Sequence, residues 1–130
     1  MKESFEIKCK LNVKPSEIYN AWLDSELHTK MTGGEAVCNH EINTVFTAWD
    51  EYISGKNIEL IPNKKIVQTW RTVEFNESDE DSTVTILLVE IENGTEVTLT
   101  HTNIPDGQTQ YKKGWEDHYF NPMKTFFEKQ

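Results

Sequence analysis

The C-terminal segment GWEDHYFNPMKTFFEKQ, residues 114–130, restricts the possible folds more than any other part of this chain. At the helical period of about 3.6 residues, one side of this segment and of the residues just before it is apolar and rich in rings. This stripe consists of Tyr111, Trp115, Tyr119, Pro122, Met123 and Phe126. Its burial is worth on the order of 10 kcal/mol before conformational entropy is subtracted. We therefore predict a long terminal helix, bent by Pro122, that covers another apolar surface.

The remaining chain provides that surface as antiparallel strands. Apolar side chains occupy every second position from Phe5 to Val13, which is the period of a half-buried strand. About six more strands are predicted, at residues 35–39, 44–49, 51–61, 64–73, 83–91 and 95–102. The last two flank Asn93-Gly94, the strongest short signal for a β-hairpin.

Two short helices are predicted between the first strand and the rest of the sheet. The first begins at Pro15, a residue that suits an opening helical turn. The second covers residues 25–31, with Leu27 and Met31 on its apolar side, and ends before Gly33-Gly34. Helices that are segregated from an antiparallel sheet indicate an α+β fold.

Length and charge limit the domain count and the classes of partner. At 130 residues the chain is long enough to bury a core. No repeat, low-complexity stretch or linker divides it, so residues 1–130 are expected to form a single domain. The net charge of −9 disfavours nucleic acid and anionic membranes as partners. No apolar run approaches the roughly 20 residues that span a bilayer. The N-terminus lacks the apolar core of a signal peptide, so we expect a cytoplasmic protein.

The sequence contains no metal, cofactor or catalytic motif. Its histidines lack the spacing of zinc ligands, and no nucleophile elbow, phosphate loop or dinucleotide fingerprint is present. The polar groups that a small-molecule enzyme would use are Gln68, His101, Tyr111 and Tyr119. The sequence pattern directs no carboxylate inward beside these groups, so catalysis is not indicated. Cys9 shares the parity of the apolar strand positions and is interpreted as a buried hydrophobe.

A curved sheet that grips one long helix can leave space between the two, because bulky rings hold the helix off the sheet. The residues predicted to line such a ligand cavity are Phe46, Trp70, His101, Trp115, Tyr119 and Met123. Tight core packing is the alternative for each ring. His101 follows Val97 and Leu99 with the same parity and should point inward, as a proton donor, a ligand anchor or a satisfied core residue. Arg71, on the opposite face from Trp70, is expected to pair with an acidic neighbour.

Three stretches resemble a known family: FTAWDEYISGKNIELIPNKKIVQTWR, GTEVTLTHTNIP and GWEDHYFNPMKTFF. They are similar to the family named after the activator of heat shock protein 90 ATPase, and to its C-terminal type of domain. That family belongs to the START-like (SRPBCC) helix-grip superfamily, which includes the major birch-pollen allergen. The resemblance runs from Pro15 to Phe126 and implies a cavity between the terminal helix and the sheet. It assigns motif positions to Gly55, Pro62, Ile66, Val67, Trp70, Arg71, Thr95, Leu99, His101, Gly114, Trp115 and Tyr119.

The chain departs from the family pattern at three places. Asn43-Thr44 stand where the family usually has a glycine pair, and Glu51 stands where a turn glycine is common. Met31 occupies a position that tryptophan often holds. The first two changes alter hairpin geometry, and the third reshapes one wall of any pocket.

Three functions follow from these observations. The leading hypothesis is a non-enzymatic domain that holds a small hydrophobic or amphipathic ligand between the sheet and the terminal helix. The first alternative is a co-chaperone-like module that modulates a heat shock protein 90 type ATPase through its outer surface. The second is a small-molecule enzyme of the cyclase or dehydratase kind. A shared fold does not choose among them.

Overall fold

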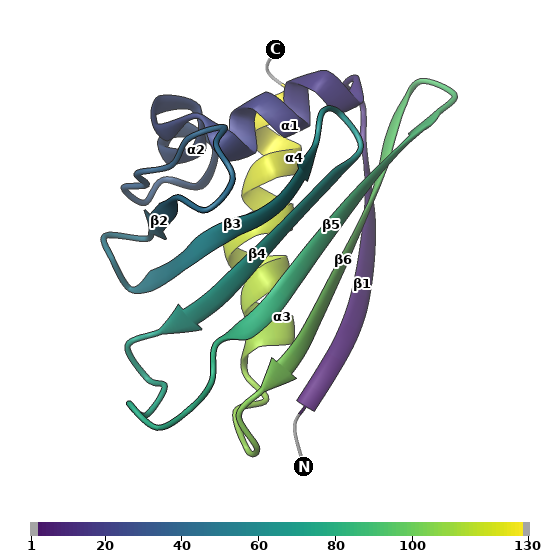
Figure 1. Ribbon diagram of the computed structural model, residues 1–130. Coiled ribbons are helices and arrows are strands. Elements are labelled where there is room, and N and C mark those ends of the chain that lie inside the picture. The colour runs from purple at the N-terminus through teal and green to yellow at the C-terminus, as the bar shows by residue number, and fades with distance from the viewer. Residues whose placement is uncertain (1–2, 129–130) are drawn as a thin grey trace.

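The computed structural model describes residues 3–128 of the chain (Figure 1). Within these residues, six antiparallel strands form one sheet in the order β1-β6-β5-β4-β3-β2. The strands are β1 (Glu3–Leu11), β2 (Val45–Ala48), β3 (Ile53–Ile61), β4 (Lys65–Thr72), β5 (Ser82–Ile91) and β6 (Gly94–Ile104). The helices are α1 (Pro15–Leu23), α2 (Ser25–Thr32), α3 (Tyr111–Trp115), the π-helix η1 (Glu116–Phe120) and α4 (Asn121–Glu128).

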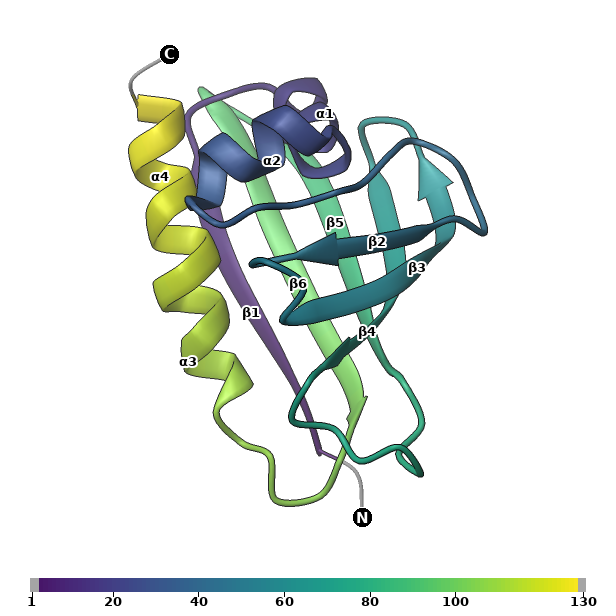
Figure 2. The same ribbon diagram turned by 90° about the vertical axis from the view of Figure 1, so that its left-hand side faces the viewer.

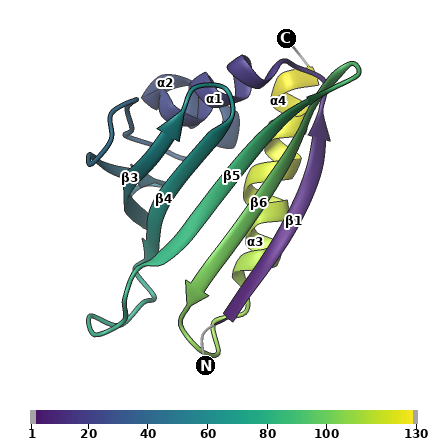
Figure 3. The ribbon, with the colours of Figure 1, turned by 45° about the vertical axis from the view of Figure 1, so that its right-hand side comes forward.

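The terminal helix, which joins α3, η1 and α4 without a break, runs along one face of the sheet (Figures 2 and 3). Alternate side chains of each strand face this helix because successive residues of a strand point to opposite sides. The buried positions are Ile66, Gln68, Trp70 and Thr72 in β4; Ser82, Val84, Ile86 and Leu88 in β5; and Thr95, Val97, Leu99, His101 and Ile104 in β6. Cys9 is also buried, as predicted. The α+β class and the helix-on-sheet arrangement are confirmed.

Helices α1 and α2 close one end of the space between the sheet and the terminal helix (Figure 2). Pro15 opens α1, and the Asp24 side chain accepts a hydrogen bond from the Leu27 backbone N–H at 2.9 Å to cap α2. The apolar face predicted for α2 is partly wrong. Leu27 is 37% exposed, and the buried side chains are His28, Met31 and Thr32.

The terminal helix contains a π-turn that the sequence pattern does not predict. Over Glu116–Phe120 the backbone bonds from i to i+5, and the Asn121 N–H reaches the Glu116 carbonyl. Such a turn holds about one residue more than an α-turn, so the buried face moves by one position. Phe127 is therefore buried in place of Phe126, which the α-helical period put in the stripe and which is only partly buried.

One further prediction is corrected by the structure. Residues 35–39 do not form a strand; the Val37–Thr47 pair is an isolated bridge. Phe75, in the acidic connection after β4, is buried and packs edge-on against Trp70, with ring centroids 6.3 Å apart. Arg71 does find its acidic partner, the Asp81 carboxylate, at 2.7 Å.

In the part of the chain that the structure describes, the helices are too short or too polar to cross a bilayer.

Candidate functional site

A small cavity lies between the first turns of the terminal helix and the sheet, with a volume of about 60 Å³. Its walls are mostly aromatic, and the residues that line it are Tyr52, Trp70, Tyr111, Gly114, Trp115, His118 and Tyr119. This volume equals roughly two water molecules, whereas pockets for drug-sized ligands hold roughly 300–1,000 Å³.

A wider hollow of about 400 Å³ lies over the cavity at the protein surface. The two spaces share Tyr52, Tyr111, Gly114 and His118, and the hollow adds Gln110, Lys113 and Asp117. A Cβ atom built on Gly114 would meet no atom within 4 Å. The space beside this glycine is therefore open, and Gly114 lines both the hollow and the cavity.

The polar side-chain atoms of Tyr111, Trp115 and Tyr119, three of the residues that line the cavity, are hydrogen-bonded inside the protein. The Tyr111 hydroxyl donates to Gln108 Oε1 at 2.6 Å and lies 2.8 Å from Thr72 Oγ1. The indole of Trp115 donates to His101, and the hydroxyl of Tyr119 bonds to His28. An occupant of the cavity consequently meets ring carbons rather than free donors or acceptors.

His101, on β6, is fully buried and joins the sheet to the terminal helix. Its Nδ1 accepts a hydrogen bond from Trp115 Nε1 at 3.0 Å, so the ring proton is on Nε2. That nitrogen lies 2.8 Å from Ser82 Oγ, whose hydroxyl donates to the Trp70 carbonyl. Burial lowers the pKa of His101 from 6.5 to about 3. The ring is therefore neutral, and both of its nitrogens have partners within the protein.

His28, on α2, makes the corresponding link to the other side of the terminal helix. Its Nδ1 donates to the Trp22 carbonyl at 2.7 Å, and its Nε2 accepts from the Tyr119 hydroxyl at 2.9 Å. Burial lowers the pKa of His28 and raises that of Tyr119. The sequence analysis missed His28. The available signal was its spacing of three residues from Met31, which puts both on one helical face.

Gln68 is the remaining polar group that an enzyme in this cavity would use. Its side chain accepts a hydrogen bond from Trp22 Nε1 at 3.2 Å and donates to Asn57 Oδ1 at 2.9 Å. The four polar candidates named from the sequence therefore all have internal partners, and the geometry shows no convergent set aimed at a substrate. Among residues 3–128, no cluster of His, Cys, Asp and Glu side chains could hold a metal ion.

Backbone strain is concentrated in the turn between β2 and β3, next to the cavity. Trp49, Asp50 and Glu51 have φ values of 51°, 57° and 71°. The left-handed conformation costs roughly 1–2 kcal/mol for each residue with a side chain. Glu51 stands where a turn glycine is common in the family, and it adopts this left-handed conformation. Asn43, which precedes β2 and is another departure from the family pattern, also adopts it (φ 67°). The turn delivers Tyr52 to the cavity.

Trp49 connects this strained turn to the π-helix. Its ring packs edge-on against His118 with centroids 5.4 Å apart, and Gly34 lies so close that a Cβ there would be 2.4 Å from the indole. Within residues 3–128, the buried Trp49 Nε1 has no hydrogen-bond partner. His118 is exposed and stands at the rim of the cavity.

The six residues predicted to line a ligand cavity are all buried but do not share one space. Trp70, Trp115 and Tyr119 line the cavity of about 60 Å³. Phe46 and Met123 belong to the surrounding hydrophobic core, His101 is a buried polar residue, and none of the three lines the cavity. Tyr52, Tyr111, Gly114 and His118 complete the lining. Lining of a ligand site by the six predicted residues stays a prediction.

Comparison with known proteins gives the family. The model of the family described as "Activator of Hsp90 ATPase homolog 1-like protein" matches residues 12–128 of this chain. The chain belongs to this family. The human activator of 90 kDa heat shock protein ATPase homolog 1 is 27% identical over 126 residues, covering 92% of this chain and 37% of the human protein. The chain thus spans about a third of the length of the curated relatives it matches.

Solved structures show the same fold. An HSP90 activator from Plasmodium falciparum has 29% identity and a TM-score of 0.88, and the match covers 96% of both chains. A Mesorhizobium loti protein with only 15% identity reaches a TM-score of 0.83 over 98% of both chains, which supports the fold alone. The fold is the START-like helix-grip fold that the sequence resemblance implies.

Proposed function

We propose that this chain is an interaction domain that modulates the ATP turnover of an Hsp90-type chaperone. The observation that carries the proposal is the similarity to the HSP90 activator from Plasmodium falciparum over 96% of both chains. The curated relatives are named as activators of the same ATPase. With such a chaperone as its partner, the chain is expected to work in the cytoplasm.

The geometry favours action through the surface over transport of a lipid-sized ligand. The space beneath the terminal helix holds about 60 Å³, which is far below the volume of a drug-sized ligand. Binding of a small hydrophobic or amphipathic molecule remains a prediction, and the space of about 60 Å³ fits only a small apolar group. Native mass spectrometry of the purified protein tests it, since a bound molecule would add mass that disappears on denaturation.

ATP turnover tests the proposal directly. The purified chain is titrated into an Hsp90-type chaperone, and the rate is measured with and without a chaperone-specific inhibitor to remove background hydrolysis. We expect the inhibitor-sensitive rate to change and to saturate with the concentration of the chain. A rate that stays constant up to a large molar excess of folded protein would reject the proposal.

A further inference from the structure

We infer that the cavity beside Gly114 is an anchor pocket that receives one aliphatic side chain from the surface of the chaperone. The inference rests on the proposed function and adds the site and the chemistry of the contact. The hollow of about 400 Å³ over the cavity would hold the backbone of the segment that carries this side chain.

The lining selects an aliphatic group. The hydroxyls of Tyr111 and Tyr119 and the indole N–H of Trp115 all bond within the protein. A charged or hydrogen-bonding occupant would therefore lose its water without gaining partners, which is costly. The volume of about 60 Å³ suits the branched end of one aliphatic side chain and excludes a lipid tail or a fused ring system.

Gly114 is the entrance to the pocket. Glycine within a helix costs roughly 0.5–1 kcal/mol relative to alanine. Gly114 lies inside α3, its φ is not positive, and a Cβ there would meet no atom within 4 Å. Neither backbone geometry nor packing within the described residues requires glycine, whereas any side chain at this position would narrow the passage from the hollow to the cavity.

Two further unfavourable local features lie at the rim of the pocket. The π-turn of η1 places His118 and Tyr119 at the cavity, and π-turns are rare and frequently found at functional sites. The left-handed turn from Trp49 to Glu51 supplies Tyr52. Strain of this kind persists where the surrounding structure holds it and clusters at binding sites.

Polar and charged side chains stand at the edge of the hollow. Lys113 and Asp117 form an exposed ion pair at 3.3 Å, and Gln110 lies beside them in the hollow. A buried apolar anchor surrounded by a polar, solvent-accessible rim is the usual anatomy of a protein–protein contact. This rim fits a polypeptide segment better than a free apolar molecule, which would leave the hollow unfilled.

A graded series at Gly114 tests the inference. Gly114→Ala adds one methyl group at the entrance, and Gly114→Leu adds a side chain long enough to fill the cavity from within. Lys112→Leu is the matched control, because Lys112 is exposed on the same helix and does not line either space. Chaperone binding is measured by calorimetry for each folded variant. Xenon binding, followed by ¹²⁹Xe NMR, reports separately whether the cavity is still accessible, since apolar cavities bind xenon.

The wild type and Lys112→Leu should bind xenon and the chaperone equally well. Gly114→Leu should lose xenon binding and bind the chaperone about tenfold more weakly, with Gly114→Ala in between. If Gly114→Leu excludes xenon but binds the chaperone as tightly as the wild type, the anchor pocket is wrong and the proposed function stands. If the wild-type chain neither binds the chaperone nor changes its ATP turnover, the proposed function fails and the pocket inference fails with it.

Discussion

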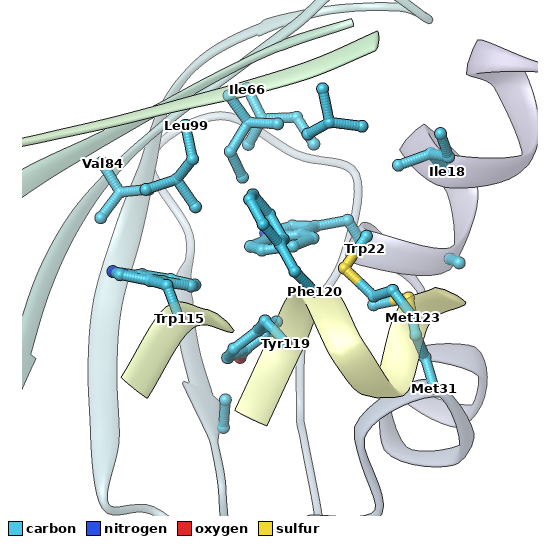
Figure 4. Close-up of a cluster of buried hydrophobic side chains, with 14 of the residues drawn as sticks. Ile18, Trp22, Met31, Ile66, Val84, Leu99, Trp115, Tyr119, Phe120 and Met123 are labelled. Atoms are coloured by element: carbon cyan, nitrogen blue, oxygen red, sulfur yellow. The ribbon is translucent and has the colours of Figure 1, made fainter. Parts of the chain in front are cut away.

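The two ends of the terminal helix pack against the rest of the protein in different ways. At the C-terminal end, which we call the closed end, Met123 is fully buried and lies next to Met31, while Phe120 points toward the sheet (Figure 4). At the other end, which we call the open end, Trp115 and Tyr119 are held by hydrogen bonds to two buried histidines, beside a cavity and a π-turn. At the closed end the side chains under the helix are buried, and a hollow of about 540 Å³, lined in part by Met31, Pro122 and Phe126, lies at the surface beside them. The open end departs from several rules of core packing. Departures of this kind concentrate where a protein functions.

Truncation of Trp115 should produce the largest loss of stability at the open end. Trp115→Ala removes a buried ring and also leaves His101 Nδ1 without its donor. We expect the free energy of unfolding to fall by about 4 kcal/mol, measured by urea denaturation. Val73→Ala, at a side chain that is 71% exposed, is the control and should stay within about 0.5 kcal/mol. A loss of less than about 1 kcal/mol for Trp115→Ala would mean that the ring is not part of the core.

Truncation of Met123 probes the closed end. Met123→Ala creates a cavity between the helix and α2, and the expected loss is about 3 kcal/mol. Met123→Leu nearly conserves volume, so it should cost less than about 1.5 kcal/mol. Equal losses for the two variants would show that the closed end is not closely packed.

Acid should destabilise the open end through its histidines. The pKa of His101 is about 3 in the folded protein against 6.5 when unfolded, so the unfolded state binds the proton first as the pH falls. Stability is therefore complete above about pH 6.5 and decreases below it, by roughly 2 kcal/mol between pH 7 and pH 5 from His101 alone. The lowered pKa of His28 acts in the same direction.

Urea denaturation at the two pH values measures this dependence. His101→Gln keeps an acceptor for Trp115 and a donor for Ser82 without a titrating ring. Its stability should vary less with pH than that of the wild type. An identical pH dependence in both proteins would exclude His101 as the source.

The smallest expected effect is a gain in stability. Gly114→Ala should raise the free energy of unfolding by about 0.5–1 kcal/mol, because alanine favours the helix and the added methyl group meets no neighbour. Lys112 is exposed on the same helix and does not line the cavity. Lys112→Ala should therefore change the free energy of unfolding by only a few tenths of a kcal/mol. A destabilised Gly114→Ala protein would show that glycine is needed for folding rather than for access.

The features that the sequence predicts well are local. The hairpin at Asn93-Gly94 and the burial of Trp115, Tyr119 and Met123 follow from residue type and period alone. The exchange of Phe126 for Phe127 could not be read in this way, since the π-turn that shifts the helical phase depends on how the whole helix fits the sheet.

The site itself was harder to predict than the fold. The link between His28 and Tyr119 joins residues 91 positions apart, so no local pattern reveals it. Strand parity placed His101 inside correctly, but it could not show that the indole of Trp115 occupies its Nδ1. Cavity volume depends on how several rings pack together, so strand parity and helical period alone do not show which buried side chains line one space.

The most direct test of the difference between the two ends is an NMR titration with an unlabelled Hsp90-type chaperone. The indole N–H signals of Trp70 and Trp115 report on the open end, and the methyl signals of Met31 and Met123 report on the closed end. We predict that the chaperone shifts or broadens the indole signals while the methionine methyl signals keep their positions. Shifts confined to Met31 and Met123, with unchanged indoles at saturation, would contradict binding at the open end of the terminal helix.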